Sequence, residues 1–332
     1  MTPAKPDRNL ALELVRVTEA AALAAAHWMG RGDKIGADGA AVDAMRLMLN
    51  SVSIDGIVVI GEGEKDAAPM LFNGEHVGTG EPPQVDIAVD PIDGTRLLSR
   101  GEANAIAVIS VAERGTMLDP GPCFYMEKVA TGPEGADVID IEKPIEDNIK
   151  AVAKAKGLDV DEVTVAMLDR PRHDDFVERA RGIGARVRLF SDGDIATAIA
   201  AARGFLGIDL LYGIGGTPEG VTSACALTCI GGAIQGRLWP RNDEECRKAI
   251  DMGYDIAKPI STRDLCSSDD IFFAATGITD GFLLEGVRYG KDRITTQSLI
   301  MRSRSGTIRT VVAEHDAGKL REIAREEPWR RH

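Results

Sequence analysis

The chain has 332 residues, of which 44% are hydrophobic and 27% are charged. This length predicts one large domain or two, since domains contain roughly 150 residues, and the composition excludes collagen-like, coiled-coil and disordered chains. The 39 basic and 52 acidic residues give a net charge of −13, which argues against a nucleic-acid-binding protein. An acidic protein that handles an anionic substrate needs metal ions or a local basic pocket.

Neither a signal peptide nor a membrane-spanning segment is expected. The most apolar early stretch, residues 20–29, is short and is interrupted by His27. The five cysteines are odd in number and contain no C-x-x-C pair, which is typical of a protein in a reducing cytoplasm. Cys225 and Cys229 lie in one apolar segment without a second Cys or His pair at zinc spacing. We interpret them as buried structural thiols.

The amino-terminal part predicts two helices and then two buried strands. Apolar residues at helical spacing over 9–29, followed by Gly30, predict an amphipathic helix with a glycine cap. A second helix is expected over 39–49. The Val- and Ile-rich runs 56–60 and 85–89 are typical of buried strands. Acidic residues follow each strand, at the edge where open α/β sheets bind ligands.

The second half alternates strands with helices, which predicts a layered α/β architecture. Strands are expected at 163–168, 186–190 and 208–212, and helices at about 174–181, at 195–203 and from about 218. Later strand-like runs at 271–275, 294–300 and 307–313 predict mixed, partly antiparallel sheets. The charged, helix-like segment 144–161 is the best candidate for a boundary, so we expect an amino-terminal domain of residues 1–155 and a carboxy-terminal domain of residues 156–332.

The chain lacks the common nucleotide-binding and hydrolase motifs, and its five histidines are not clustered. Its candidate chemistry instead depends on acidic residues that lie near glycines at the ends of predicted elements. These residues are Asp38, Glu62, Glu64, Asp90, Asp93 and Glu219. Oxygen ligands without imidazole or thiolate favour Mg²⁺ or Mn²⁺.

The segment 89–95, with the sequence VDPIDGT, is the most specific motif. Asp90 ends a predicted strand, Pro91 cannot extend the strand ladder, and Gly94 and Thr95 are expected to begin a helix whose N–H groups face an anion. An ordinary strand, a turn capped by Asp and a helix start would show the same pattern. The sequence GEGE after the neighbouring strand favours the functional interpretation.

Taken together, the segments GRGDK, ADGAA, IGEGE with Asp66, VDPIDGT, RPRHD, SDGD and YGIGGTPEG resemble the class II fructose-1,6-bisphosphatases of the GlpX type. This family lies within the metal-dependent, lithium-sensitive sugar and inositol phosphatases. The resemblance extends from the first helix to about Glu314. It implies a layered α-β-α-β-α sandwich with mixed sheets, assembled as a homodimer or homotetramer. It also implies hydrolysis of the 1-phosphate of fructose 1,6-bisphosphate to fructose 6-phosphate, in the gluconeogenic direction.

The resemblance assigns metal ligands, most of them to the amino-terminal domain. Asp38 and Glu62 match ligands for one metal ion, and Asp90, Asp93 and Glu219 match ligands for further metal. Two cations some 3.5–4 Å apart can hold a water as hydroxide and neutralise the leaving oxygen.

Asp66 and Thr95 match a pair that orients the attacking water in the family. Phosphoryl transfer depends mainly on placement and neutralisation of charge. We therefore expect direct attack by a metal-bound water without a phosphoenzyme, with Thr95 as the polarising group and not the nucleophile.

The remaining matches concern the substrate and lie mainly in the carboxy-terminal domain. Arg170 and Arg172 match the residues that hold the remote phosphate, and guanidinium groups suit phosphate because they bind it through paired hydrogen bonds. Without the resemblance, two arginines in a loop are more often solvated. His173, next to them, is expected to be an exposed turn residue. The other matching positions are Lys34, Asp93, Gly94, Thr95, Tyr125, Asp192, Gly193, Asp194 and Gly216.

Asp192 and Asp194 match residues that bind sugar hydroxyls, although Asp192-Gly193-Asp194 is also typical of a turn and helix cap. Alternatives within the enzyme class are sedoheptulose 1,7-bisphosphatase activity, alone or added, and inositol monophosphatase activity. The arginine pair argues for a bisphosphate. A catalytically silent sensor of sugar phosphate or divalent ions is the alternative outside that class, and it would have no use for a water-activating pair.

Overall fold

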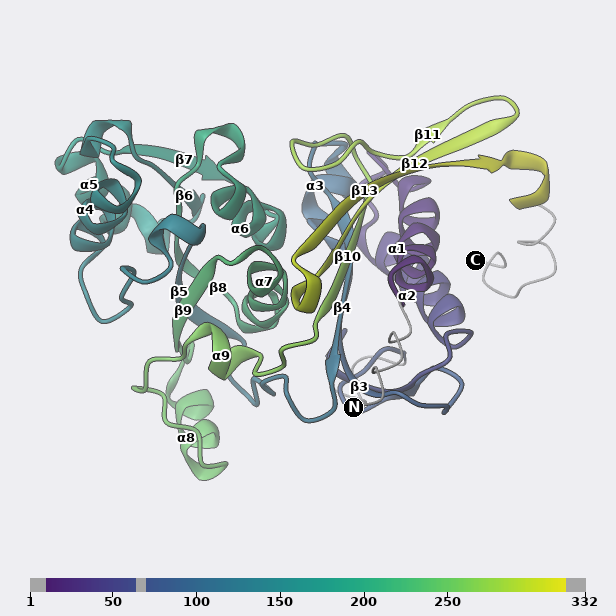
Figure 1. Cartoon of the computed structure of the whole chain (residues 1–332), viewed down its shortest axis with the longest axis horizontal. Coiled ribbons are helices and arrows are strands. Elements are labelled where there is room, and N and C mark those ends of the chain that lie inside the picture. Colours follow the sequence, from purple (N-terminus) through teal and green to yellow (C-terminus); the bar gives the residue numbers. More distant parts are fainter. Residues whose placement is uncertain (1–9, 64–69, 321–332) are drawn as a thin grey trace, which may run out of the picture.

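The computed structural model describes residues 10–63 and 70–320. Two β-sheets alternate with three layers of helices, which confirms the expected α-β-α-β-α sandwich with mixed sheets (Figure 1). Helices α1 (Ala11–Ala26) and α2 (Lys34–Leu49) cover the outer face of the larger sheet. Helices α6 (Asp194–Arg203) and α7 (Thr217–Ile230) fill the middle layer. The outer face of the smaller sheet is covered by α4 (Ile145–Lys156) and α5 (Asp174–Gly182).

The larger sheet has eight strands in the order β11-β12-β10-β4-β3-β1-β2, with β13 paired to β12. Strands β1 and β3 are parallel, and the other neighbours are antiparallel. The strands are β1 (Asp55–Ile60), β2 (His76–Val77), β3 (Gln84–Asp93), β4 (Ile106–Glu113), β10 (Phe272–Gly277), β11 (Arg288–Tyr289), β12 (Arg293–Arg302) and β13 (Thr307–Asp316).

The smaller sheet has five strands in the order β7-β6-β8-β5-β9. Strand β6 runs parallel to β7 and β8, whereas β5 runs antiparallel to β8 and β9. The strands are β5 (Tyr125–Thr131), β6 (Thr164–Leu168), β7 (Arg186–Phe190), β8 (Leu210–Gly216) and β9 (Ala233–Leu238). The other α-helices are α3 (Thr95–Arg100), α8 (Asp243–Asp251) and α9 (Thr262–Leu265), and short 3₁₀ helices lie at Pro133–Gly135, Val160–Glu162, Pro171–His173, Phe205–Gly207 and Ser303–Ser305.

The chain passes from the larger sheet to the smaller between β4 and β5, and it returns between β9 and β10. The segment 144–161 contains α4, which packs in the outer layer of the smaller sheet. The division into domains of residues 1–155 and 156–332 stays a prediction. Among the described residues, none of the helices combines the length and the apolar character that a membrane crossing requires.

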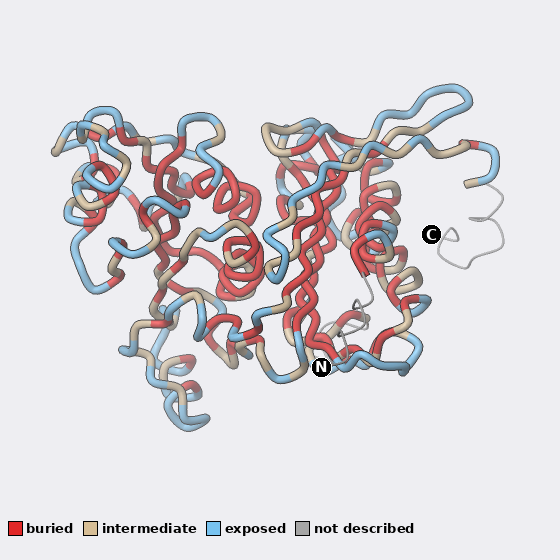
Figure 2. The backbone as a smooth tube through the Cα atoms, viewed as in Figure 1, coloured by how far each residue is buried: buried red, intermediate tan, exposed pale blue. Residues whose placement is uncertain are grey.

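The core follows the layers, because helices cover both faces of the central strands. Every residue of β4 except Glu113 is buried, and β10 is buried throughout. Figure 2 shows the central strands and the middle helices coloured mostly as buried, and side chains from both belong to one hydrophobic cluster. A strand buried on both faces loses the alternation of apolar and polar residues. Cys225 and Cys229 are buried on α7 and free of disulfides, as expected.

Two helix boundaries differ from the sequence prediction. Helix α1 ends at Ala26, and its cap is His27 rather than Gly30. Gly30 instead adopts a left-handed conformation with φ of 72° in the following turn, where its N–H donates to the carbonyl of Leu98 on α3. Helix α2 begins earlier than expected, at Lys34, because the Asp33 carboxylate accepts the Gly36 N–H at 2.9 Å and caps the first turn.

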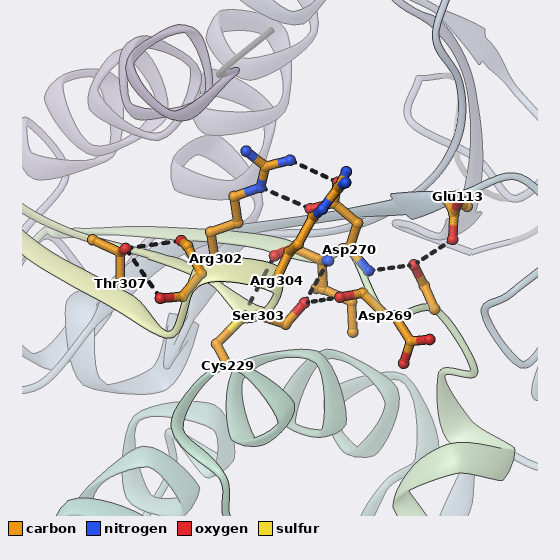
Figure 3. A network of polar contacts seen from close by, with 11 residues as sticks. Glu113, Cys229, Asp269, Asp270, Arg302, Ser303, Arg304 and Thr307 are labelled. Atoms are coloured by element: carbon orange, nitrogen blue, oxygen red, sulfur yellow. Dashed lines mark hydrogen bonds and ion pairs between the residues drawn. The ribbon is translucent and has the colours of Figure 1, made fainter. Parts of the chain in front are cut away.

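A polar network fixes the segment where the chain re-enters the larger sheet (Figure 3). Arg302 at the end of β12 donates two hydrogen bonds to Asp270, from Nε at 2.7 Å and from Nη2 at 2.6 Å. The Ile271 N–H donates to Ser303 Oγ at 2.8 Å, and the Ile271 carbonyl accepts a longer contact from Cys229 Sγ of α7 at 3.7 Å. The network therefore joins the residues just before β10 to the end of β12 and to the middle helix α7.

Candidate active site

A cavity of about 530 Å³ opens where β1 and β3 end and where α6 and α7 begin. Carboxyl ends of parallel strands are the usual ligand-binding edge of such sheets. Its other walls come from the loop 120–124, Asn73 and Arg241. The predicted residues that line it are Glu62, Asp90, Asp93, Gly94, Thr95, Asp192 and Glu219. The cavity thus brings together most of the predicted metal ligands.

The VDPIDGT segment turns both of its carboxylates toward this cavity through an irregular strand end. Strand β3 does not stop at residue 89 as predicted but continues to Asp93, and its pairing with β4 shifts between Asp90 and Asp93. Asp90 Oδ1 accepts the Ile92 N–H at 3.1 Å, which closes a tight turn. Gly94 then adopts φ of 99°, where a Cβ would meet Leu97 at 2.9 Å, and α3 begins at Thr95 as expected.

Burial and mutual repulsion raise the pKa values of the carboxyl groups in the cavity. Burial, and then the charges of Asp38 and Glu219, raise the pKa of Glu62 to about 7. Glu62 keeps accessible surface because it lines the cavity, yet the protein atoms around it displace bulk water. The pKa of Asp90 lies well above its usual value, first because of burial and then because of Asp93 and the neighbouring glutamates.

Asp93 is 4% exposed and lies near a second group of acids. Burial raises its pKa well above the usual value, and the charges of Asp192 and Asp194 raise it further. The Ala196 N–H of α6 donates to Asp93 Oδ2 at 3.3 Å. Asp192 accepts the Arg96 N–H at 3.2 Å, and burial raises the pKa of Asp192 as well. Asp93 therefore connects the metal-ligand candidates to the sugar-binding candidates.

Glu219 lies in the first turn of α7, where the carboxylate faces Gly216. A Cβ on residue 216 would collide with Glu219 Oε2, so a larger residue there would displace this carboxylate. Among the described residues, no hydrogen-bond donor contacts the buried Glu219 Oε2. Burial raises the pKa of Glu219, whereas the charge of Lys128 lowers it. A buried carboxylate oxygen without a protein donor is suited to a cation.

Asp38 does not line the cavity but is joined to it through Thr95. Thr95 Oγ1 is 3.1 Å from Asp38 Oδ1 and 3.2 Å from the Ile92 carbonyl, so its proton can be donated to either oxygen. Burial raises the pKa of Asp38, and the hydrogen bond from Thr95 lowers it. Asp66, the predicted partner of Thr95, and Glu64 lie outside the described residues.

A buried ion pair lies next to the residues that line the acidic cavity. Lys128 Nζ of β5 lies 2.5 Å from Asp194 Oδ2, and the side chains are only 3% and 7% exposed. Lys128 also donates to the Gly216 carbonyl at 3.3 Å. Gly215 packs against the pair, since a Cβ there would lie 2.9 Å from Lys128 Nζ. The pair therefore holds Asp194 beside the segment that positions Glu219.

The donor set of the cavity fits a hard divalent cation by its chemistry. It offers carboxylate oxygens from Glu62, Asp90, Asp93 and Glu219, together with the unpartnered Glu219 oxygen, and such oxygen sets favour Mg²⁺ or Mn²⁺ over zinc. In the described part of the chain, however, no three acidic, His or Cys side chains come together as a closed metal-binding group. The carboxylates are close enough to raise one another's pKa.

The predicted remote-phosphate residues lie apart from the lining of this cavity. Arg172 donates from Nε and Nη2 to the Ile214 carbonyl, at 3.2 and 2.7 Å, and its guanidinium stacks on Tyr125 at 5.1 Å. Arg170 donates to the carbonyls of Asp169 and Ser191. Both guanidinium groups are thus oriented by backbone oxygens. Lys34 is exposed at the start of α2, and its charge lowers the pKa of Asp38.

The expectation for His173 was wrong, because this residue is 1% exposed. Its Nε2 accepts the Ile214 N–H at 2.7 Å, so Nδ1 carries the proton and donates to the Leu168 carbonyl at 2.7 Å. Burial lowers the pKa of His173. The imidazole therefore links the ends of β6 and β8. His173 accepts the Ile214 N–H and Arg172 donates to the Ile214 carbonyl, so both backbone groups of Ile214 are hydrogen-bonded.

Sequence reasoning missed three residues of this region. Lys128, Arg241 and Phe124 belong to none of the recognised motifs. Lys128 meets Asp194 across 66 positions of sequence, and Phe124 and Arg241 reach the cavity from separate loops. No local pattern marks such contacts.

Residues 8–315 match the sequence family described as bacterial fructose-1,6-bisphosphatase, glpX-encoded. The chain is 46% identical over 321 residues to fructose-1,6-bisphosphatase 1 class 2 of Escherichia coli strain K12, an alignment that covers 93% of this chain and 95% of the relative. Fructose-1,6-bisphosphatase class 2 of Escherichia coli O6:H1 and of Shigella flexneri show the same identity and coverage. The chain belongs to the glpX-encoded fructose-1,6-bisphosphatase family. This family implies a divalent metal cofactor, in agreement with the donor set.

Replacing Lys128 with Met should lower the free energy of unfolding by about 3–5 kcal/mol, because the change leaves the buried Asp194 carboxylate uncompensated. Urea denaturation measures this loss. The double variant Lys128→Met with Asp194→Leu should recover part of it, since both charges are then absent. Lys150→Met is the matched control, because Lys150 pairs with Asp147 at 3.9 Å on the surface. A Lys128→Met protein as stable as the control would contradict the role of the pair.

The carboxylates should also make the metal-free protein less stable as the pH rises. A raised folded pKa, such as about 7 for Glu62, means that the folded protein binds more protons than the unfolded chain between the two pKa values. The stability that this extra proton binding contributes is fully present below the unfolded pKa of about 4.5 and is lost as the pH rises through the folded pKa of about 7. Thermal denaturation in EDTA should show a melting temperature that falls as the pH rises. Glu62→Gln should make this dependence of the melting temperature on pH less steep.

Added Mg²⁺ or Mn²⁺ should raise the melting temperature more at pH 8 than at pH 5.5, because cations bind ionised carboxylates. An equal rise at both pH values, or a Glu62→Gln protein with the slope of the unchanged chain, would argue against an ionising cluster at this cavity.

Proposed function

We propose that this chain hydrolyses the 1-phosphate of fructose 1,6-bisphosphate, giving fructose 6-phosphate and phosphate. The observation that carries the proposal is the gathering of Glu62, Asp90, Asp93 and Glu219 around Thr95 in one cavity of a chain that matches this family along 93% of its length. An acidic cavity repels a sugar phosphate unless cations offset its charge. The site thus fits a metal-dependent phosphatase.

The proposed metal ligands are Asp38 and Glu62 for one ion, and Asp90, Asp93 and Glu219 for further metal. Mg²⁺ and Mn²⁺ are the candidates. When bound, such ions supply positive charge that neutralises phosphoryl oxygens and lowers the pKa of water. Asp38 is joined to the cavity by the hydrogen bond from Thr95 at 3.1 Å, and its charge raises the pKa of Glu62 in the cavity lining.

Thr95 is the proposed polarising group for the attacking water. Its hydroxyl lines the cavity and already contacts the Asp38 carboxylate. A threonine hydroxyl that donates its proton to a carboxylate can accept a hydrogen bond from water and orient it. Asp66 is the proposed second member of this pair. Attack would then occur directly at phosphorus, without a covalent intermediate.

The sugar and the second phosphate are proposed to bind along the smaller-sheet side of the cavity. Asp192 and Asp194, on either side of Gly193, are the candidates for sugar hydroxyls, and Asp194 is held by Lys128. Arg170 and Arg172 are the candidates for the remote phosphate. The other proposed substrate contacts are Lys34, Asp93, Gly94, Tyr125 and Gly216.

The wider setting is proposed from the family alone. We propose that the protein works in the cytoplasm, in gluconeogenesis, as a homodimer or homotetramer, with neither nucleic acid nor a membrane as partner. Sedoheptulose 1,7-bisphosphate is the second candidate substrate, because the pair of Arg170 and Arg172, of which Arg172 stacks on Tyr125, would suit the remote phosphate of either bisphosphate.

The deciding experiment measures phosphate release from fructose 1,6-bisphosphate, sedoheptulose 1,7-bisphosphate and inositol 1-phosphate, each with Mg²⁺, Mn²⁺ or EDTA. We expect turnover of the fructose bisphosphate that EDTA abolishes and that exceeds turnover of the inositol phosphate. Turnover of inositol phosphate alone would reassign the substrate within the metal-dependent phosphatases. Binding of sugar phosphate without any turnover would instead indicate a sensor.

Replacing Thr95 with Ala should lower kcat by about a hundredfold or more and leave KM close to its original value, because the hydroxyl acts on the transition state. Steady-state kinetics with fructose 1,6-bisphosphate check this split. Thr228→Ala is the matched control, since the Thr228 hydroxyl donates to the Ala224 carbonyl within α7 and is not among the described groups that line the cavity. An unchanged kcat in Thr95→Ala would remove Thr95 from the mechanism.

A further inference from the structure

Arg241 is the only lysine or arginine among the described residues that line the acidic cavity. It lies in the loop between β9 and α8, outside every motif that the sequence singled out. Its side chain is 53% exposed, so the guanidinium is accessible. Five carboxyl groups line the same cavity, from Glu62, Asp90, Asp93, Asp192 and Glu219. Within the described lining, a phosphate that enters this space therefore meets one cationic side chain.

The position of Arg241 is fixed by contacts on two sides. Glu245 on α8 accepts from Arg241 Nε at 3.2 Å and forms an ion pair with Nη2, also at 3.2 Å. The guanidinium stacks on the ring of Phe124 at 5.4 Å, and the Phe124 N–H donates to Glu245 at 3.4 Å. Arg241 Nη1 makes no hydrogen bond to any described residue. A held guanidinium with remaining N–H donors is suited to bind an oxyanion.

Arg241 is also separated from the arginines proposed for the remote phosphate. The rings of Phe124 and Tyr125 meet edge to face at 5.0 Å. Arg241 stacks on Phe124, whereas Arg172 stacks on Tyr125 at 5.1 Å. Only Arg241 and Phe124 of these four line the acidic cavity. Two guanidinium groups thus stack on one pair of aromatic rings: Arg241 on the ring that lines the cavity, and Arg172 on the ring outside its lining.

We propose that Arg241 binds the phosphoryl group that is positioned among the carboxylates, and that Glu245 and Phe124 orient it for this contact. The substrate class rests on the proposed function: the group is the 1-phosphate of a sugar bisphosphate and, after hydrolysis, inorganic phosphate. In a cavity of this charge, a guanidinium offsets the repulsion between the phosphoryl oxygens and the carboxylates. Arg241 is therefore a second, protein-borne source of positive charge for the reacting phosphate.

The test separates the two phosphate positions by using the two products as probes. Calorimetry measures binding of inorganic phosphate and, separately, of fructose 6-phosphate to the full chain with Mg²⁺. Arg241→Met should weaken binding of inorganic phosphate about tenfold or more and change binding of fructose 6-phosphate by less than about twofold. Arg241→Lys, which keeps the charge but not the planar fork, should recover part of the loss. A fold-change in dissociation constant is a direct readout that needs no turnover.

The matched control is Arg237→Met. Arg237 lies on β9, forms an ion pair with Glu127 of β5 at 2.8 Å, and does not line the cavity. Thermal denaturation of each variant confirms that it is folded. The proposal is overturned if Arg241→Met binds inorganic phosphate as the unchanged chain does, if fructose 6-phosphate is the probe that weakens, or if the unchanged chain with Mg²⁺ does not bind inorganic phosphate. Failure of sugar-phosphate hydrolysis, with phosphate binding still dependent on Arg241, would reject the proposed function alone.

Discussion

The burial and mutual repulsion of carboxylates gathered in one cavity form the constraint on which the arrangement of this protein depends. Each acid would be more stable apart and in bulk water, and the raised pKa of Glu62, to about 7, records the cost. The fold keeps the acids together because they lie at or just after the ends of β1 and β3 and in the first turn of α7. Gly216 leaves room for the Glu219 carboxylate where any side chain would collide with it. The free energy gained by packing in the rest of the fold offsets the cost of gathering these carboxylates.

Positive charge reaches the cavity from two directions, and the two cations differ in their surroundings. Lys128 is buried against Asp194 and lowers the pKa of Glu219 without lining the cavity. Arg241 lines the cavity and remains accessible, with Glu245 as its partner. A buried cation of this kind organises its neighbours, whereas an exposed one can exchange its solvent contacts for a ligand. A chain with a net charge of −13 therefore still places one cationic side chain in the cavity lining and another close to it.

The sequence predicted most elements and the acidic group, and its failures have a common physical cause. VDPIDGT carries its turn, glycine and helix start within seven consecutive residues, so a local pattern was enough to place Asp90 and Asp93. His173 sits in an equally turn-like segment, yet its burial depends on Ile214, which is 41 residues away. The partner of Lys128 is similarly distant. Strand β4 gave no alternating pattern, because helices cover both its faces.

The middle helices explain why neither sheet alone could form the site. Glu62, Asp90 and Asp93 come from the larger sheet, whereas Glu219 lies at the start of α7, directly after β8 of the smaller sheet. Helix α7 packs between both sheets (Figure 1), and at its far end Cys229 contacts the Ile271 carbonyl beside the Arg302–Asp270 pair. The same helix is thus anchored at one end by a polar network and carries a carboxylate into the cavity at the other. Placement of Glu219 consequently depends on the chain having returned to the larger sheet, which makes completion of the acidic cavity a property of the whole fold.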